Sequence, residues 1–161
     1  MVLTGMTGAA WASSLPRIQP QDADEPIHIR ADSAELDEAA GTVIYRGKVE
    51  LQQGSMNLQA DLLTILLVDE QVSRIEARGE RARYSQQVRD DGMTVVAQAR
   101  TIIYLTQDEL IELTGNAHME QGPNSFSGGL IRYDMRAGRV LAEADSDDGI
   151  RMILTPSSRP D

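Results

Sequence analysis

The sequence is short of several residue types, and each shortage removes a class of function. It has no cysteine, so structural disulfides, thiol catalysis and zinc–thiolate sites are excluded. Lys48 is the only lysine among 15 basic residues, and 25 acidic residues bring the formal net charge to −10. Nucleic-acid phosphates demand a basic face, so this balance argues against a nucleic-acid partner. No apolar run approaches the roughly 18 residues that a membrane-spanning helix needs.

Catalytic and metal-binding motifs are also lacking. The two histidines, His28 and His118, each stand between apolar residues, which predicts solvated positions on the outer faces of strands. The acidic run at Asp145, Asp147 and Asp148 lacks the spacing and the closing Glu of a calcium loop. The sequence has no nucleophile elbow, phosphate-binding loop or dinucleotide fingerprint. We therefore expect neither an enzyme nor a bound cofactor or metal.

What the sequence does contain is a repeat. The segment Gly47–Gly54 (GKVELQQG) returns as Gly115–Gly122 (GNAHMEQG), and this offset of 68 residues persists on both sides without a gap. Inside each copy apolar and polar residues alternate, which is the period of a half-buried strand. The flanking glycines fit a bulge or corner before the strand and a turn after it. The chain therefore contains two copies of one strand–turn–strand unit.

The same alternation continues through most of the chain. Short alternating segments follow one another every 8 to 12 residues or so, with no helical segments between them, and this predicts one all-β domain over residues 26–154. The phase slips at Asp61–Leu62, which predicts a strand corner because one residue of register reverses the faces. Residues 86–92 are polar and are expected to form a loop. A sandwich, a roll or a barrel would satisfy this pattern.

The two ends of the chain differ from this domain. Residues 1–12 are small, apolar and uncharged, and Ala10–Ala12 has the form of a signal-peptidase site, although the basic start of a signal peptide is missing. We interpret residues 1–12 as the remnant of a signal peptide, with an unstructured tail as the alternative. Residues 13–25 are expected to form a flexible leader, and residues 155–161 a disordered tail.

The inward faces of the predicted strands are the candidate binding surface. Aromatic residues make up only 4% of the chain, so these faces are mostly aliphatic. They would form either a closed core or a groove between two sheets, open enough for acyl chains that gain about 0.8 kcal/mol per buried CH₂. The residues expected to line this groove are Ile27, Ile29, Leu36, Val49, Leu51, Leu58, Tyr84, Tyr104, Met119 and Phe126.

Several segments, by their order and spacing, match a known family: Pro26–Asp32 (PIHIRAD), Gly47–Val49 (GKV), Gln53–Gly54, Ala60–Asp61 and Leu113–Ala117 (LTGNA). On these segments the chain resembles the OstA-like family of periplasmic lipopolysaccharide-transport proteins. The resemblance implies a twisted, V-shaped antiparallel β-jellyroll of about 16 short strands, open at both ends. It also implies a periplasmic carrier that holds the acyl chains of lipid A in an apolar groove and bridges the inner and outer membranes. Expected partners are lipopolysaccharide, a membrane-anchored jellyroll protein of the inner membrane, the jellyroll domain of an outer-membrane translocon, and further copies joined head to tail.

Individual roles follow partly from this resemblance. Met119 and Phe126 are assigned to the groove by alternation alone. Cations for the phosphates of lipid A would have to come from Arg78, Arg81 or Arg83, which are otherwise plain solvated charges. The positions that match the lipid path of the family are Ile27, Ile29, Tyr84 and Tyr104.

A different class of function stays open beside lipid transport. The alternative is a β-roll scaffold or polysaccharide-binding module with a closed core. Polysaccharide binders usually expose aromatic platforms, and this chain has one Phe and one Trp, Trp11, within the predicted signal-peptide remnant. The composition therefore favours the lipid carrier.

The outermost strands are the expected contact surfaces between copies. An open jellyroll leaves unpaired backbone groups at its first and last strands, here residues 27–31 and 150–154. These two edges differ in sequence, so a contact between them is heterologous and propagates as a filament instead of closing into a ring.

Overall fold

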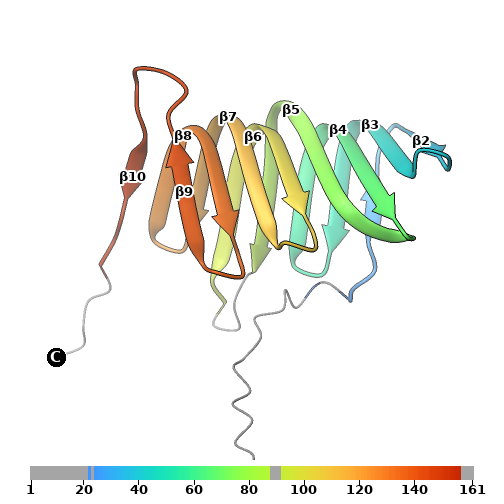
Figure 1. Ribbon diagram of the computed structural model, residues 1–161, viewed down its shortest axis with the longest axis horizontal. Coiled ribbons are helices and arrows are strands. Elements are labelled where there is room, and N and C mark those ends of the chain that lie inside the picture. The colour runs from blue at the N-terminus through green and yellow to red at the C-terminus, as the bar shows by residue number, and fades with distance from the viewer. Residues whose placement is uncertain (1–21, 23, 88–91, 157–161) are drawn as a thin grey trace, which may run out of the picture.

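The computed structural model describes residue 22, residues 24–87 and residues 92–156. Within these residues the chain forms ten antiparallel strands in one continuous sheet (Figure 1). The predicted signal-peptide remnant, residues 1–12, lies outside the described residues, as do residues 157–161 of the predicted tail. The strands are β1 (His28–Arg30), β2 (Ser33–Asp37), β3 (Thr42–Gln53), β4 (Met56–Val68), β5 (Gln71–Gln87), β6 (Thr94–Leu105), β7 (Leu110–Gln121), β8 (Asn124–Asp134), β9 (Arg139–Glu143) and β10 (Arg151–Ile153).

The central strands are long because they bend instead of ending. Strand β4 runs through the predicted corner, and its register against β5 shifts between Gln59 and Leu62. The register between β3 and β4 shifts in the same way between Arg46 and Val49, and comparable shifts recur between the following pairs as far as β7 and β8. These aligned irregularities form a fold line across the sheet, at which every strand from β3 to β8 changes direction.

The predicted repeat supplies the backbone geometry of this fold line. Gly47 and Lys48 have φ of 80° and 46°, and their repeat equivalents Gly115 and Asn116 have φ of 83° and 49°. Two successive residues with positive φ leave the extended conformation and turn the strand, which explains why each copy starts with a glycine. The corner that the sequence predicts at the start of each repeat is confirmed.

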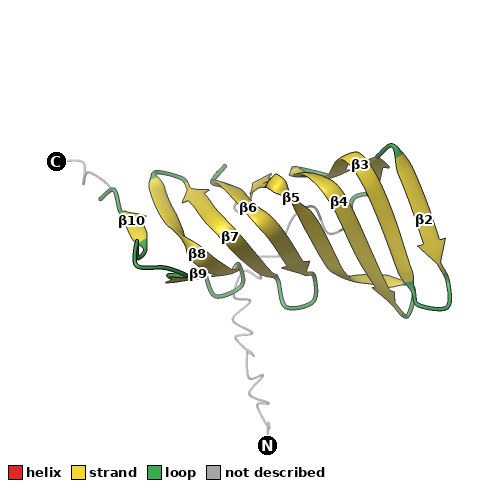
Figure 2. Cartoon of the chain, turned by 90° about the horizontal axis from the view of Figure 1, so that it is seen from above, coloured by secondary structure: helices red, strands yellow, loops and turns green. Residues whose placement is uncertain are grey.

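Folding along this line gives the sheet two leaves. We call them the β1 leaf, which contains β1, β10 and the halves of β3–β8 that lie beside them, and the β2 leaf, which contains β2, β9 and the other halves. Each leaf therefore has eight strand segments. The strands turn over one long edge of the roll, and hairpins line the opposite edge, which we call the mouth (Figure 1). Seen from above, β2 lies at one end of the roll and β9 and β10 at the other (Figure 2).

The hydrophobic core lies between the leaves and is built from cross-strand rows. Near the fold line the inward residues are small, including Ala82, Ala99 and Ala117, because the leaves converge there. Farther from it the residues become larger, and two long rows face each other. The row of the β1 leaf is Ile29, Leu51, Leu58, Tyr84, Ala97, Met119, Phe126 and Met152. The row of the β2 leaf is Leu36, Val43, Ile65, Ile75, Tyr104, Ile111, Tyr133 and Val140.

The all-β antiparallel roll expected from the sequence is confirmed, but its strands are counted differently. Ten strands replace the expected 16 or so, because β3–β8 keep their backbone ladders through the fold line. Strand β5 also continues to Gln87, so Gln86 belongs to a strand and not to the predicted loop. No helix among the described residues is long and apolar enough to span a membrane.

Candidate functional site

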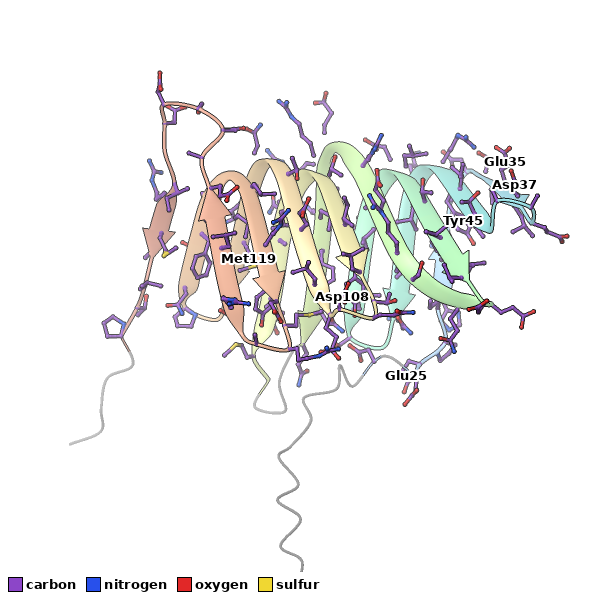
Figure 3. The ribbon with its side chains drawn as sticks, viewed as in Figure 1. Glu25, Glu35, Asp37, Tyr45, Asp108 and Met119 are labelled. Carbon is purple, nitrogen blue, oxygen red and sulfur yellow. The ribbon has the colours of Figure 1, made fainter. Side chains whose placement is uncertain are left out.

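The interior between the leaves is the apolar surface that the sequence predicted, and most of the predicted residues lie in it. Seven of the ten side chains are buried, each with at most 7% of its surface exposed. Six of the ten, from Ile29 to Phe126, stand in the single row of the β1 leaf. Figure 3 shows one of them, Met119, within the roll. The buried seven are Val49, Leu51, Leu58, Tyr84, Tyr104, Met119 and Phe126.

The other three predicted residues lie at the N-terminal end of the roll. Ile27 and Ile29 are half-buried and pack against the core from the first edge. Leu36 is 59% exposed, so it is not buried between the leaves as the seven are. It is in register with inward-facing Val43, yet β2 is the outermost strand of its leaf and nothing described covers it. Leu36 therefore marks the open end of the interior.

A cavity of about 380 Å³ opens at the mouth near this end. One lip is formed by Ile27 and Gln53 and the other by Val72 and Thr106, whereas Tyr104 stands deeper, in the long row of the β2 leaf. Its volume falls within the range of roughly 300–1,000 Å³ that is usual for small-molecule sites. The cavity shows that the leaves are not fully closed on each other here.

A buried polar cluster borders the apolar interior at the mouth. Asp22 and Gln86 are the buried polar side chains of the described chain, with 7% and 2% exposure. The hydroxyl of Tyr84 donates a hydrogen bond to Gln86 Oε1, and Gln86 Nε2 donates to Asp22 Oδ2 at 3.1 Å. Ser55, in the β3–β4 turn, completes the cluster: its backbone N donates to Asp22 Oδ1 at 2.9 Å and its Oγ donates to Asp22 Oδ2. An amphipathic ligand would meet apolar surface inside and polar groups at the mouth.

The tyrosines of the interior are held in their neutral form. Burial raises the pKa of Tyr84 well above its ordinary value, with further contributions from Tyr104, Tyr133 and Asp22. Burial, followed by the negative charges of Glu109 and Asp22, raises the pKa of Tyr104 to about 12. Their rings thus add apolar surface, and their hydroxyls act as neutral hydrogen-bonding groups at physiological pH.

Sequence reasoning missed the polar cluster. Asp22 falls within the predicted flexible leader and Gln86 within the predicted loop, so neither position carried a strand pattern. The only local signal was the Gly54–Ser55 turn, whose amides need an acceptor. The partner of that turn lies 33 residues earlier in the chain, and no local pattern indicates such a contact.

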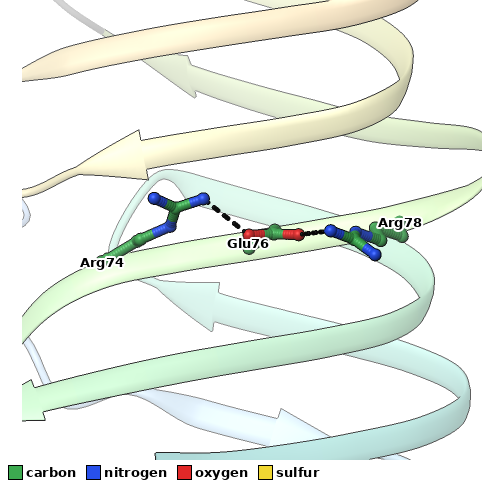
Figure 4. Close-up of polar contacts among 3 residues, drawn as sticks. All are labelled: Arg74, Glu76 and Arg78. Atoms are coloured by element: carbon green, nitrogen blue, oxygen red, sulfur yellow. Dashed lines mark hydrogen bonds and ion pairs between the residues drawn. The ribbon is translucent and has the colours of Figure 1, made fainter.

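The arginines considered for lipid A phosphates point away from the interior. On β5, Ala82 and Tyr84 are buried, which places Arg81 and Arg83 on the outer face. Arg78 lies on the outer face as well, where its Nη2 is 2.5 Å from Glu76 Oε1 (Figure 4). Their position keeps these three cations out of the interior.

The outer face of β5 carries a compact ion-pair group. Arg74 Nη2 lies 2.7 Å from Glu76 Oε2, on the side opposite Arg78 (Figure 4). Partial burial acts to raise the pKa of Glu76, but the hydrogen bonds and charges of both arginines outweigh it and lower that pKa. This group holds the strand surface together and has no access to the interior.

Neither a metal centre nor a catalytic arrangement emerges from the described residues. They contain no group of three or more His, Asp or Glu side chains that could hold a metal ion. His118 Nδ1 lies 2.8 Å from Ser127 Oγ and its Nε2 lies 3.3 Å from Glu120 Oε1, on the outer face of β7 and β8. This His–Ser–Glu contact lies on the outer face of the sheet, where 39% of the His118 side chain is exposed. The second histidine, His28, is exposed, as predicted.

These features define a class of protein: an open antiparallel sheet, folded on itself, whose leaves enclose an apolar interior with a polar mouth. A family model described as LptA/(LptD N-terminal domain) LPS transport protein matches residues 28–139, and the chain belongs to this family.

Individual relatives agree with this assignment. The chain is 34% identical to the lipopolysaccharide export system protein LptH of Pseudomonas aeruginosa, over 98% of this chain and 94% of that protein. It is 28% identical to the lipopolysaccharide export system protein LptA of Escherichia coli K12, over 93% and 82%. The crystal structure of LptH, described as the LptA-homologous periplasmic component of the lipopolysaccharide transport device, matches with a TM-score of 0.78 at 31% identity. That match covers 85% of this chain and 100% of the other.

Proposed function

We propose that this protein is a periplasmic carrier of lipopolysaccharide that holds the acyl chains of lipid A between its two leaves. The observation that carries the proposal is the continuous pair of apolar rows between the leaves, in a chain that belongs to a lipopolysaccharide-transport family. Acyl chains need only apolar surface, at about 0.8 kcal/mol per buried CH₂. Among the described residues, no cation is buried in that interior. The hydroxyl and amide groups at the mouth suit the polar part of such a lipid.

The ends of the roll support head-to-tail assembly. Each leaf has eight antiparallel segments, an even number, so its first and last strands run in opposite directions. A second copy placed end to end in the same orientation would add β1 to β10 and β2 to β9, and both new pairs would be antiparallel. The exposed strands at both ends provide the backbone groups for this pairing.

The side chains at the two ends fit a specific register. If the inward rows continue from one copy to the next, Leu36 meets Val140 and Ile29 meets Met152. Leu36 and Met152 are 59% and 43% exposed, and this contact would bury both. In the same register Asp37 of one copy faces Arg139 of the next, which complements charge across the contact.

The same ends are the proposed contacts with the two membranes. A jellyroll anchored in the inner membrane would pair with one edge, and the jellyroll domain of an outer-membrane translocon with the other. Backbone pairing of sheet edges requires a free strand more than a particular side-chain sequence, so one mode of contact serves homologous partners and further copies alike. A row of such rolls would give lipid a continuous apolar path.

Site-specific photo-crosslinking in cells tests the lipid path. A photoreactive residue at Ile29 or Tyr104 is expected to label lipopolysaccharide, because both lie in the inward rows. His28 and Ile103, each one residue out of phase, are the matched controls and are expected to stay unlabelled. Equal labelling of inward and outward positions would contradict the proposal.

A further inference from the structure

We propose that the segment before β1 is a latch that closes the mouth of the roll at its N-terminal end and must open for lipid to enter there. We call this segment, Asp22 and residues 24–27, the strap. The inference rests on the proposed function, since a latch over an interior that carries nothing would have no purpose. It assigns a role to the Asp22 cluster, which the apolar rows leave unexplained.

The strap is anchored at Asp22 by hydrogen bonds with the β1 leaf. Its carboxylate accepts from Ser55 N and Ser55 Oγ in the β3–β4 turn, and from Gln86 Nε2 on β5. The turn is shaped to receive it, since a Cβ at Gly54 would come within 2.1 Å of Asp22 Oδ1. Ser55 Oγ in turn accepts from the backbone N of Gln87 at 3.1 Å. A carboxylate held by neutral donors on a turn and a strand is a specific attachment.

The other end of the strap reaches toward the opposite leaf. Ile27 lines the mouth cavity together with Val72, Thr106 and Glu109, which lie in or next to the hairpins of the β2 leaf. Asp22 is close enough to Tyr104 of that leaf for its charge to raise the pKa of the phenol. Residues 24–26 are exposed. The strap therefore lies along the mouth at this end, bonded to the β1 leaf at Asp22 and Glu25, with Ile27 at the cavity between the leaves.

The attachment is of a kind that can be released. Residues 24–26 bury no side chain. The Glu25 backbone N donates to Asp22 O, and Gln53 Nε2 donates to Glu25 O. Leaving the mouth would expose the turn amides and Gln86 to water, which can replace the carboxylate as a partner. The sheet itself loses no ladder hydrogen bond, because the strap precedes β1. Opening is thus a local event that leaves the roll folded.

A reversible covalent lock tests the latch, and the chain suits this test because it has no cysteine. The variant Asp22→Cys/Ser55→Cys replaces the contacting pair, so that oxidation holds the strap closed and reduction leaves it without its carboxylate. A pair on the outer face, His118→Cys/Ser127→Cys, is the control. Each carries a photoreactive residue at Tyr104 and is mixed with purified lipopolysaccharide. Oxidation of the strap pair is expected to slow labelling at least about tenfold, and reduction to restore it, the control being unaffected.

A second comparison does not depend on disulfide formation. The nearly isosteric Asp22→Asn removes the charge of the anchor and is expected to speed labelling several-fold relative to the natural chain, while Asp24→Asn, on an exposed part of the strap, leaves the rate unchanged. Equal labelling of the oxidised and reduced strap variants would overturn the latch and leave lipid carriage standing. If Tyr104 is labelled in no form of the protein, lipid carriage itself fails, and the latch fails with it.

Discussion

The Asp22 carboxylate is buried and accepts hydrogen bonds from the neutral donors of Ser55 and Gln86, so its charged form depends on these bonds. Burial acts to raise its pKa, but the bonds from Ser55 Oγ and N, Gln86 and the backbone of Met56 outweigh burial and lower the pKa below the ordinary 3.8. A group whose pKa is lowered on folding stabilises the fold above its unfolded pKa. That contribution is lost as the pH falls through the folded value.

This sign gives a prediction for Asp22→Asn. At neutral pH the variant is expected to be less stable by about 1–3 kcal/mol, the usual range for hydrogen bonds to a charged group. Between neutral pH and about pH 3 the natural chain should lose more stability than the variant, because only the natural chain protonates this site. Urea unfolding at both pH values measures the two differences. A parallel loss in both proteins would show that Asp22 contributes nothing to the acid response.

At the scale of elements, the fold line makes the strongest demands on the sequence. Gly47 has φ of 80°, and a Cβ there would lie 2.3 Å from Asp32 Oδ2 and 2.9 Å from Asp32 Cβ. Asp32 has little room to withdraw, since its backbone N donates to Arg46 O and Gly47 O at 3.1 and 2.9 Å. By contrast, Gly122 has φ of 55° and nothing within 4 Å of such a Cβ. Substitutions at these two glycines therefore separate the effect of steric crowding, present only at Gly47, from that of backbone strain, present at both.

We therefore expect Gly47→Ala to cost more than Gly122→Ala. Both variants pay about 1–2 kcal/mol for placing a side chain at positive φ, and Gly47→Ala adds a clash, for a total of about 2–4 kcal/mol. Urea unfolding of the two variants against the natural chain gives the difference. Equal costs would mean that Asp32, which directly precedes β2, moves away from the new side chain, and that the corner is less rigid than its geometry indicates.

The sequence predicted the elements whose signals are local. The repeated glycines and the slip at Asp61–Leu62 indicated the corners, and alternation indicated the inward rows. The predicted number of strands was too high, because a slip in the alternation of apolar and polar residues looks the same whether the backbone ladder breaks or bends. Alternation predicted that Leu36 faces inward, but it gives only the face of a residue and not its distance from the end of the sheet. It therefore could not show that Leu36 is exposed. The Asp22–Ser55 contact joins distant segments and left no periodic trace.

At the scale of the whole molecule, the two ends are chemically unlike the outer faces. Large exposed apolar side chains gather at the C-terminal end, at Leu141, Ile150, Met152, Ile153 and Leu154, and Leu36 is exposed at the other end. The sequence predicted the edges at residues 27–31 and 150–154. The structure adds β2 and β9, so that each end offers two strands, one from each leaf. In the proposed assembly, two strands at each end would fix the rotation of one roll on the next, which a single strand would leave free.

The proposed register predicts which residues of two copies touch. With cysteines at Leu36 and Val140, oxidation should link successive copies into a ladder of oligomers, since the inward rows meet there. Replacing the second site by Leu141, which lies one residue out of phase and is 46% exposed, should remove the ladder. Denaturing electrophoresis without reductant distinguishes the two. A ladder from the Leu141 pair and none from the Val140 pair would place the contact in another register.

Proline on the last strand tests the association itself. Met152→Pro removes a backbone donor from β10, a strand of three exposed residues that contributes little to the core. Association should therefore weaken, while the free energy of unfolding of the monomer should change by no more than about 0.5 kcal/mol, as is usual for exposed sites. Sedimentation over a concentration series measures the first effect and thermal unfolding the second. If the natural chain stays monomeric at the highest concentration, copies do not pair end to end, and the edges are left to the membrane partners.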